Sequence, residues 1–223
     1  GIRDMQPGMV FAQDVMDGDV LYCVWHDISK RKRAEQRQQH HNRILAMLAQ
    51  RKLLPDVLDT FVRDLEAIRP GCRCCILLLE EDGRHLTLGA APNLPDHYRK
   101  AIEHLGVGAG IGSCGTAAFT GQRVVVADIA THPDWQAYRE LAQLCGLAAC
   151  WSQPIVSAQS RVIGTLALYL GQPGEPTPED LHLMEYEVRL AALVIEKTAS
   201  EASLQLAASV FTHAREGISI TDP

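Results

Sequence analysis

Residues 106–155 read GVGAGIGSCGTAAFTGQRVVVADIATHPDWQAYRELAQLCGLAACWSQPI. The stretch opens on a glycine-rich turn, continues into a short helical patch at 116–120 and enters a buried strand at 123–127. A loop and a helix follow over 128–145, and a second strand is expected at 149–156. This order lays one helix and one long loop over the face of a sheet, which is how a small domain forms a cavity. The stretch therefore predicts a pocket without naming its ligand.

On the N-terminal side of this stretch, the pattern predicts a helix followed by a hairpin. Pro55 suits the first turn of a helix that carries one broad apolar face. Segments 73–80 and 85–90 are typical of strands, and the E-D-G-R between them predicts a tight turn because glycine supplies the positive φ. A short helix is expected at 96–105.

On the C-terminal side, Val162–Leu170 predicts a final strand with a bulge or a close backbone approach at Gly164. Thr177 and Pro178 suit the N-cap and first position of a long exit helix. Along this helix, apolar and small residues recur at heptad spacing: Val188, Ala192, Ile195, Ala199, Ala202, Leu206 and Ser209. The first half of this seam could pack on the domain's own sheet, but from Glu196 onward we expect dimerisation.

Composition limits the classes of function. The chain has 223 residues, 47% of them hydrophobic, which suffices for one core of about 150 residues with flanking pieces. Its net charge of −6 argues against nucleic acid as a partner, because phosphate binding needs clustered basic residues. No apolar run reaches the roughly 18 residues that span a bilayer, and no signal peptide is recognisable. We therefore expect a cytoplasmic protein without membrane contact.

The seven cysteines show no spacing typical of a disulfide framework, so reduced thiols are expected. Cys72 and Cys75 form a C-x-x-C, but strand alternation would place their thiols on opposite faces. A zinc site of this kind would also need a second pair of ligands.

The two ends of the chain resemble parts of PAS sensor domains. H-D-I-S-K-R-K at 26–32 resembles the D-I-T-x-R-K signature that closes such domains, and VFTHAREGISITDP at 210–223 resembles the start of another. The resemblance implies the end of one PAS domain at 1–28 and the start of a second at 210–223. Between them we expect a linker helix at 29–50 and a coiled-coil helix at 197–209.

The segment between these helices, residues 51–196, resembles a GAF domain. Its motifs occur in the order of that family: C-x-I-L-L-L at 74–79, A-A-P-N-L-P at 90–95, G-I-G-S-C-G-T-A-A at 110–118 and G-T-L-A-L-Y at 164–169. They are similar to GAF domains of bacterial sensor histidine kinases and of GGDEF/EAL proteins of cyclic-di-GMP signalling. The resemblance implies an α+β fold, with an antiparallel sheet of about six strands, helices on both sides and long terminal signalling helices.

The same resemblance implies a regulatory module that binds a small ligand or senses redox state and relays the signal to an output domain. It would act as a homodimer through its N- and C-terminal helices. Positions matching the cavity side of the family give candidate ligand-binding residues: Cys114, Asp128, His132, Trp135, Tyr138, Cys150, Trp151 and Ser152.

The sequence leaves the cofactor open. His132 with Cys114 and Cys150 could ligate iron, zinc or haem, whereas a lone loop histidine is more often a hydrogen-bond partner. Cys150 and Trp151 could equally belong to the core, since both residue types are often buried.

Enzymatic signatures are absent from the sequence: there is no GGDEF, EAL, Walker A or G-x-S-x-G motif and no phosphoacceptor box. We therefore expect no catalysis by this chain itself. Two alternatives stay open. Free methionine-(R)-sulfoxide reductases are GAF folds with a G-x-C-G turn like Gly112–Gly115, but they need a cysteine in the cavity loop, where this chain has Pro133, Asp134 and Trp135. The other alternative is a structural spacer that binds no ligand.

Overall fold

The computed structural model contains two compact units, residues 1–43 and 44–223. The structure describes residues 5–7, 11–15, 18–22, 25–27 and 29–213, and their side chains over 31–205. The predicted start of a second PAS domain lies mostly outside these residues.

Two short antiparallel ladders make up the start of the first unit. Strand β1 (Met5–Pro7) pairs with β4 (Trp25–Asp27), and β2 (Phe11–Val15) pairs with β3 (Gly18–Tyr22). Helix α1 (Ser29–Ala49) follows, and its residues 31–39 are exposed, as expected for a charged helix start. The PAS assignment of this unit stays a prediction.

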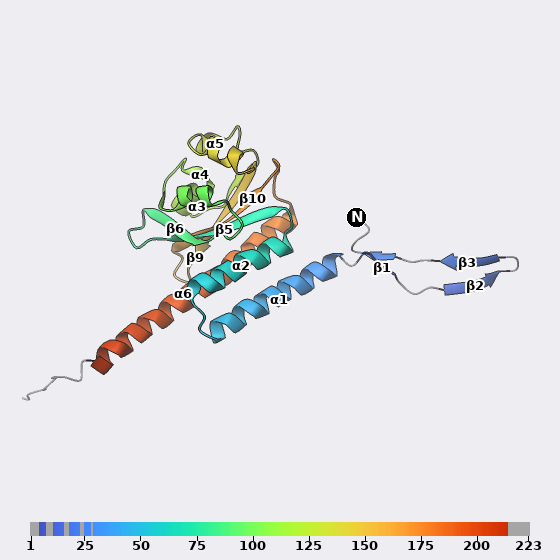
Figure 1. Cartoon of the computed structure of the whole chain (residues 1–223), viewed down its shortest axis with the longest axis horizontal. Helices are drawn as coiled ribbons and strands as arrows, with labels where there is room; N and C mark the ends of the chain where they lie inside the picture. Colours follow the sequence, from blue (N-terminus) through green and yellow to red (C-terminus); the bar gives the residue numbers. More distant parts are fainter. Residues whose placement is uncertain (1–4, 8–10, 16–17, 23–24, 28, 214–223) are drawn as a thin grey trace, which may run out of the picture. The chain divides into compact units, whose positions relative to one another are not determined.

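The second unit is built on a six-stranded sheet in which every neighbouring pair is antiparallel (Figure 1). The strand order is β7-β6-β5-β10-β9-β8. Their bounds are β5 (Cys72–Leu79), β6 (His85–Ala90), β7 (Leu105–Gly106), β8 (Val124–Val126), β9 (Ala149–Val156) and β10 (Val162–Leu170). The predicted α+β class with about six antiparallel strands is confirmed.

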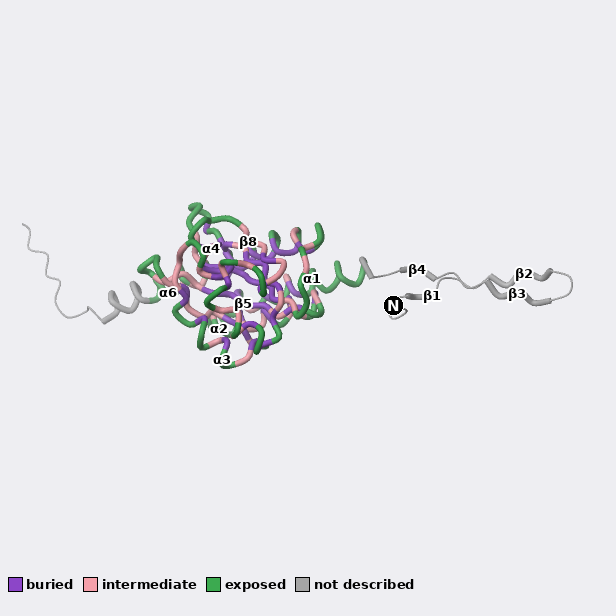
Figure 2. Tube along the Cα trace, turned by 90° about the horizontal axis from the view of Figure 1, so that it is seen from above, coloured by how far each residue is buried: buried purple, intermediate pink, exposed green. Residues whose placement is uncertain are grey.

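Helices cover both faces of this sheet (Figure 1). Helices α2 (Leu54–Ile68) and α6 (Pro178–His213) lie on one face. The other face carries α3 (Asp96–Ile102), α4 (Gly112–Thr120), the short 3₁₀ helix η2 (Pro133–Trp135) and α5 (Arg139–Leu144). Each set of helices closes its own hydrophobic core against the sheet, and the buried residues of both cores lie inside the unit (Figure 2).

Helix α4 begins earlier than the sequence predicts. The expected helical patch starts at Thr116, whereas the helix starts at Gly112, inside the glycine-rich turn. The reason is close packing: a Cβ on Gly115 would lie 2.5 Å from the Gly106 carbonyl oxygen. Glycine is therefore needed in this turn to let a helix approach the edge of the sheet, not only to reverse the chain.

The predicted bulge in the last strand is confirmed. The register between β10 and β9 shifts between Val162 and Gly164. A Cβ on Gly164 would lie 2.4 Å from the Leu77 carbonyl oxygen, so the backbones of β10 and β5 approach as closely as only glycine permits.

The start of α6 is fixed by a capping box. The Asp180 backbone N–H donates to Thr177 Oγ1 (3.2 Å), and the Thr177 N–H donates to Asp180 Oδ2 (3.0 Å). Arg69, at the end of α2, pairs with the same carboxylate, with 2.6 Å between Nε and Oδ1. The predicted N-cap is thus confirmed, and the cap also joins α6 to α2.

Helix α6 packs on its own sheet over its first half. Val188 and Ala192 of the predicted seam are buried, and Ile195 is packed against the same core. Exposed apolar side chains on this helix include Leu193 and Leu204. None of the helices in the described part of the chain combines the length and the apolar character that crossing a bilayer requires.

Candidate functional site

Sulfur and hydroxyl groups gather inside the core beneath α3 and α4. Strands β5, β9 and β10 each present alternate residues to this face, and the third residue of α4 points down onto them. We call this group the thiol cluster; it consists of Cys75, Cys114, Cys150, Ser152, Thr165 and Tyr169. All six are at most 3% exposed. So many buried sulfur and hydroxyl groups distinguish this side of the sheet from an ordinary apolar core.

Tyr169 lies at the centre of the thiol cluster. Its hydroxyl oxygen is 3.6 Å from Cys75 Sγ and 3.9 Å from Cys114 Sγ. Ser152 Oγ donates to Cys114 Sγ over 3.6 Å. The two thiols therefore lie beside the same tyrosine hydroxyl.

These contacts make the thiols unequal. The neighbouring Cys75 thiol, together with the hydroxyls of Ser152, Thr165 and Tyr169, outweighs burial and lowers the pKa of Cys114 to about 7. The N-terminal turn of α4 also favours a negative charge at Cys114. The neighbouring Cys114 thiol, together with burial, raises the pKa of Cys75 well above the usual thiol value. Burial likewise raises the pKa of Cys150. Cys114 is thus the thiol in this cluster that ionises first.

Aromatic rings cover the thiol cluster. Trp135 on η2 donates from Nε1 to Ser113 Oγ over 3.0 Å, and its ring lies edge-on to Tyr169 with 6.4 Å between centroids. Tyr98 of α3 contacts Tyr169 in the same manner at 5.6 Å, and Tyr138 contacts Trp135 at 6.4 Å. These rings therefore pack against one another beside the thiol cluster.

Asp128 and His132, which the sequence proposes as ligand contacts, form hydrogen bonds within their own loop. Asp128 accepts hydrogen bonds from the Ala130 backbone N–H and from Thr131 Oγ1, both at 3.0 Å. His132 Nδ1 accepts from the Asp134 N–H at 3.3 Å. These roles agree with His132 as a hydrogen-bond partner in a turn.

Trp151 lies on the opposite face of the sheet from Cys150 and Ser152, because neighbours along β9 alternate. Its Nε1 donates to the Gly174 carbonyl oxygen over 3.0 Å. The Arg69 guanidinium lies 6.0 Å from the ring centroid. The structure thus brings Cys114, Cys150, Ser152, Trp135 and Tyr138 together and leaves Trp151 with the helices α2 and α6.

Three members of the thiol cluster are not among the residues that the sequence proposes: Cys75, Thr165 and Tyr169. Period-two alternation could have grouped Thr165 with Tyr169, and it does separate Cys75 from its neighbour Cys74. What the alternation could not show is which face lies under α4.

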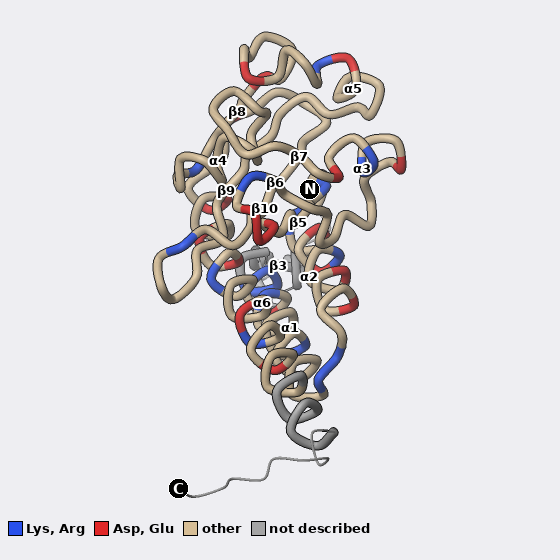
Figure 3. The backbone as a smooth tube through the Cα atoms, turned by 90° about the vertical axis from the view of Figure 1, so that its left-hand side faces the viewer, with Lys and Arg blue, Asp and Glu red and all other residues tan. Residues whose placement is uncertain are grey.

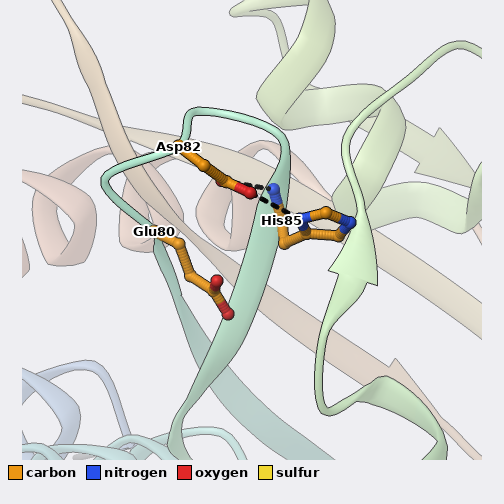
Figure 4. Close-up of side chains that lie close together, drawn as sticks. All are labelled: Glu80, Asp82 and His85. Carbon is orange, nitrogen blue, oxygen red and sulfur yellow. Dashed lines mark hydrogen bonds and ion pairs between the residues drawn. The ribbon is translucent and has the colours of Figure 1, made fainter.

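A second group of metal-ligating side chains lies at the β5–β6 turn, where Glu80, Asp82 and His85 approach one another (Figure 4). Asp82 already accepts hydrogen bonds from the Arg84 N–H at 2.8 Å and from His85 Nδ1 at 2.6 Å. The bond from the Arg84 backbone, followed by that from His85, lowers the pKa of Asp82. Glu80 pairs with His104 at 2.8 Å. These contacts suffice to explain the group as a turn-stabilising network.

The surface carries charges of both signs. Figure 3 shows basic and acidic residue positions mixed along α2 and α6. A groove of about 380 Å³ lies beside α6, and within it Arg123 pairs with Glu185 (2.7 Å) and with Gln153 (2.8 Å). The Arg123 guanidinium in this groove is therefore already paired with a carboxylate of the protein.

Comparison with known proteins identifies the family. Residues 52–196 match the family model described as GAF domain. The methyl sulfide methyltransferase-associated sensor of Methanosarcina acetivorans is 37% identical over 179 residues, covering 80% of this chain and 18% of that protein. This chain thus spans less than a fifth of that relative's length.

Solved structures share the fold at low identity. The GAF domain of an Acinetobacter phosphoenolpyruvate-protein phosphotransferase superposes with a TM-score of 0.58 at 18% identity, covering 76% of this chain and 98% of that one. Free methionine-R-sulfoxide reductase of Neisseria meningitidis does so with a TM-score of 0.56 at 20% identity, covering 76% and 93%. The family match, supported by this shared fold, shows that the chain belongs to the GAF domain family.

Proposed function

We propose that this chain is a regulatory sensing module in which the state of the thiol cluster controls the start of helix α6. The sensor role of the Methanosarcina relative supports the general assignment. The observation that carries the proposal is the position of β9, which contacts the thiol cluster with one face and the α6 anchor with the other.

The first connection runs through Trp151. Its neighbours Cys150 and Ser152 belong to the thiol cluster, while its own indole holds the Gly174 carbonyl oxygen, shortly before α6 begins. A change in packing that displaces β9 on the cluster side must therefore move this hydrogen bond as well.

The second connection runs through Arg69. Its guanidinium lies over the Trp151 ring and pairs with Asp180, the residue that completes the cap of α6. Trp151 thus contacts both the segment that precedes α6 and the arginine that pairs with its cap. A small shift of β9 would bias the helix without unfolding the domain.

The signal would leave along α6, which has 36 residues. Leu193 and Leu204 expose 47% and 68% of their surface and suit a helical interface with a second copy of the chain. We propose a homodimer through α1 and α6 that passes the signal to an output domain, with a small ligand or an oxidant as the input. Sedimentation velocity of the purified chain tests the assembly, and a monomer at all concentrations would contradict it.

Hydrogen exchange tests the relay. Ser152→Val removes a hydroxyl from the thiol cluster and adds an apolar branch, so we expect altered amide exchange over residues 174–184. Thr87→Val makes the same kind of change on β6, three strands away from β9 in the sheet, and should leave that segment unaltered. If Ser152→Val alters exchange in β9 but not in 174–184, the relay is wrong and the structural-spacer alternative is favoured.

A catalytic role is a second candidate, favoured by the lowered pKa of Cys114 in its G-x-C-G turn. Reduction of free methionine-(R)-sulfoxide by the chain with dithiothreitol as reductant tests this role. Turnover that is lost in Cys114→Ser would establish it, whereas turnover no faster than that of dithiothreitol alone would reject it.

A further inference from the structure

We propose that Cys114 and Cys75 form a peroxide-reactive pair, in which Cys114 is oxidised by a hydroperoxide and Cys75 closes an internal disulfide. The proposal rests on the sensing function above and names its input chemistry. It requires a nucleophilic sulfur, a second thiol close to it, and a route for a small oxidant.

The surroundings of Cys114 suit a thiolate. Its sulfur lies 3.6 Å from the Ser152 hydroxyl oxygen and 3.9 Å from that of Tyr169. Thr165 of the same cluster is fully buried, and its hydroxyl has no hydrogen-bond partner among the described residues. Burying hydroxyls around a sulfur is costly in an apolar core unless they stabilise a polar or charged group.

Cys75 suits the resolving role. Its sulfur lies 3.6 Å from the Tyr169 hydroxyl oxygen, which is itself 3.9 Å from the Cys114 sulfur. Because its pKa is raised, it stays protonated while Cys114 ionises and does not compete for the oxidant. A low-pKa thiol with a second thiol nearby is the arrangement expected of redox-sensing cysteines.

The chemistry balances with hydrogen peroxide as oxidant. The Cys114 thiolate attacks one peroxide oxygen, the O–O bond breaks, and the products are a sulfenic acid and hydroxide, which takes a proton to become water. The Cys75 sulfur then attacks the sulfenic sulfur, the S–S bond forms, the S–O bond breaks, and the Cys75 proton leaves in a second water. Two electrons pass from the two sulfurs to the peroxide.

Access to Cys114 is narrow, since the residue is 3% exposed. The cover above it is closed by the bond between Trp135 Nε1 and Ser113 Oγ, next to Cys114 in the chain. A molecule as small as hydrogen peroxide needs only a brief opening of this cover. Bulky thiol reagents should therefore react much more slowly than peroxide.

Other thiols in the described part of the chain offer competing outcomes. Cys72 and Cys74 lie on the opposite face of β5 with their sulfurs 3.6 Å apart, and burial raises the pKa of Cys74. Cys145 lies 3.0 Å from His97 Nε2, and its pKa is also raised by burial. Neither of these sites collects hydroxyl donors around a sulfur as Cys114 does.

The test is peroxide treatment of the reduced chain, followed by alkylation of the remaining thiols and mass spectrometry. We expect an intact mass lower by two hydrogens before alkylation, and fragments that link Cys75 to Cys114. Cys114→Ser should abolish the link, and Cys75→Ser should leave a sulfenic acid that dimedone traps. Cys74→Ser, adjacent in sequence but on the other face, and Cys150→Ser should both retain the link. The rate should rise with pH through about 7, following the pKa of Cys114.

A link between Cys72 and Cys74, or oxidation confined to Cys145, would overturn the proposal. The disulfide can be identified in the wild-type chain. This measurement therefore tests the proposal even if a substituted chain fails to fold. Hydrogen exchange over 174–184 after oxidation separates the two proposals. A Cys75–Cys114 link without a change there supports the thiol pair and contradicts the relay. If no link forms but Ser152→Val still alters the segment, the thiol pair is wrong and the relay stands.

Discussion

The two faces of one sheet have different chemistry. The face under α2 and α6 is packed with apolar side chains such as Phe61, Ile76 and Leu168. The face under α3 and α4 buries cysteines, hydroxyls and tyrosine rings in contact with one another. Because neighbouring residues in a strand point to opposite faces of the sheet, strands β5, β9 and β10 contribute side chains to both faces. The comparison suggests that the first face stabilises the domain and positions α6, while the second carries the chemistry.

Truncation on the apolar face should have the largest effect. Phe61 is fully buried, so Phe61→Ala leaves a cavity and should lower the free energy of unfolding by about 3–5 kcal/mol. Urea denaturation measures it. Cys150→Ala removes a single buried sulfur from the other face and should cost clearly less. Equal losses for the two variants would contradict the division between the faces.

The next effect is steric. Gly115→Ala places a methyl group 2.5 Å from the Gly106 carbonyl oxygen, and a backbone atom cannot move aside cheaply. We expect a loss of about 1–3 kcal/mol and faster alkylation of Cys114, because α4 must lift from the sheet. Gly174→Ala, where an added methyl meets no described atom within 4 Å, is the control. Unchanged stability in Gly115→Ala would show that α4 is not tightly seated.

A smaller change removes only one hydroxyl from the thiol cluster. Tyr169→Phe keeps the ring and deletes the oxygen that contacts Cys75 and Cys114, at a cost of about 1 kcal/mol. The pKa of Cys114 should rise, because this hydroxyl helps to lower it. The pH dependence of iodoacetamide alkylation of Cys114 reports the shift. Tyr138→Phe is the control, and an equal shift there would mean that the hydroxyl of Tyr169 has no specific role.

The smallest effect concerns the cap of α6 and its pH dependence. Burial alone would raise the pKa of Asp180, but hydrogen bonds from Arg69 and Thr177 outweigh it and lower the pKa. A carboxylate with a lowered folded-state pKa adds stability above its unfolded value, near 4, and loses it as pH falls through the folded value.

Asp180→Asn should therefore reduce stability near pH 7 by up to about 1 kcal/mol and weaken its decline below about pH 4. Urea midpoints across this pH range measure both effects, with Glu103→Gln on the exposed end of α3 as a control. If the stability of Asp180→Asn falls with decreasing pH as steeply as that of the wild type, groups other than Asp180 cause the loss of stability in acid.

Most of the fold could be predicted from local signals. The strands at 85–90, 149–156 and 162–170 have the predicted bounds, because alternation and turn residues are properties of the segment alone. Helix α3 ends at Ile102 rather than at the predicted 105, because Leu105 and Gly106 pair with β6. Tertiary pairing of this kind overrides local propensity.

The site was harder to predict than the fold. Cys114 and Ser152 were proposed from motif positions, and they do contact each other. Thr165 and Tyr169 were not proposed, since a strand that reads G-T-L-A-L-Y gives no sign of which side will meet a helix N-terminus. Trp151 was grouped with its neighbours in sequence, whereas the pleat of β9 places it on the other face. Motifs locate a segment, but the choice of face is made by packing.

The capping box fixes the rotational position of the first turn of α6 about the helix axis. Because Thr177 and Asp180 hold the first turn, every later residue of the helix has a defined bearing around the axis, set by 100° steps. Over its 36 residues the helix extends about 54 Å, so a slight rotation at the cap becomes a displaced contact surface far from the domain. An insertion of seven residues changes the phase by only about 20°, whereas an insertion of two residues rotates it by about 200°, close to half a turn. The helix thus determines both how far from the domain its distal contact surface lies and which way that surface faces.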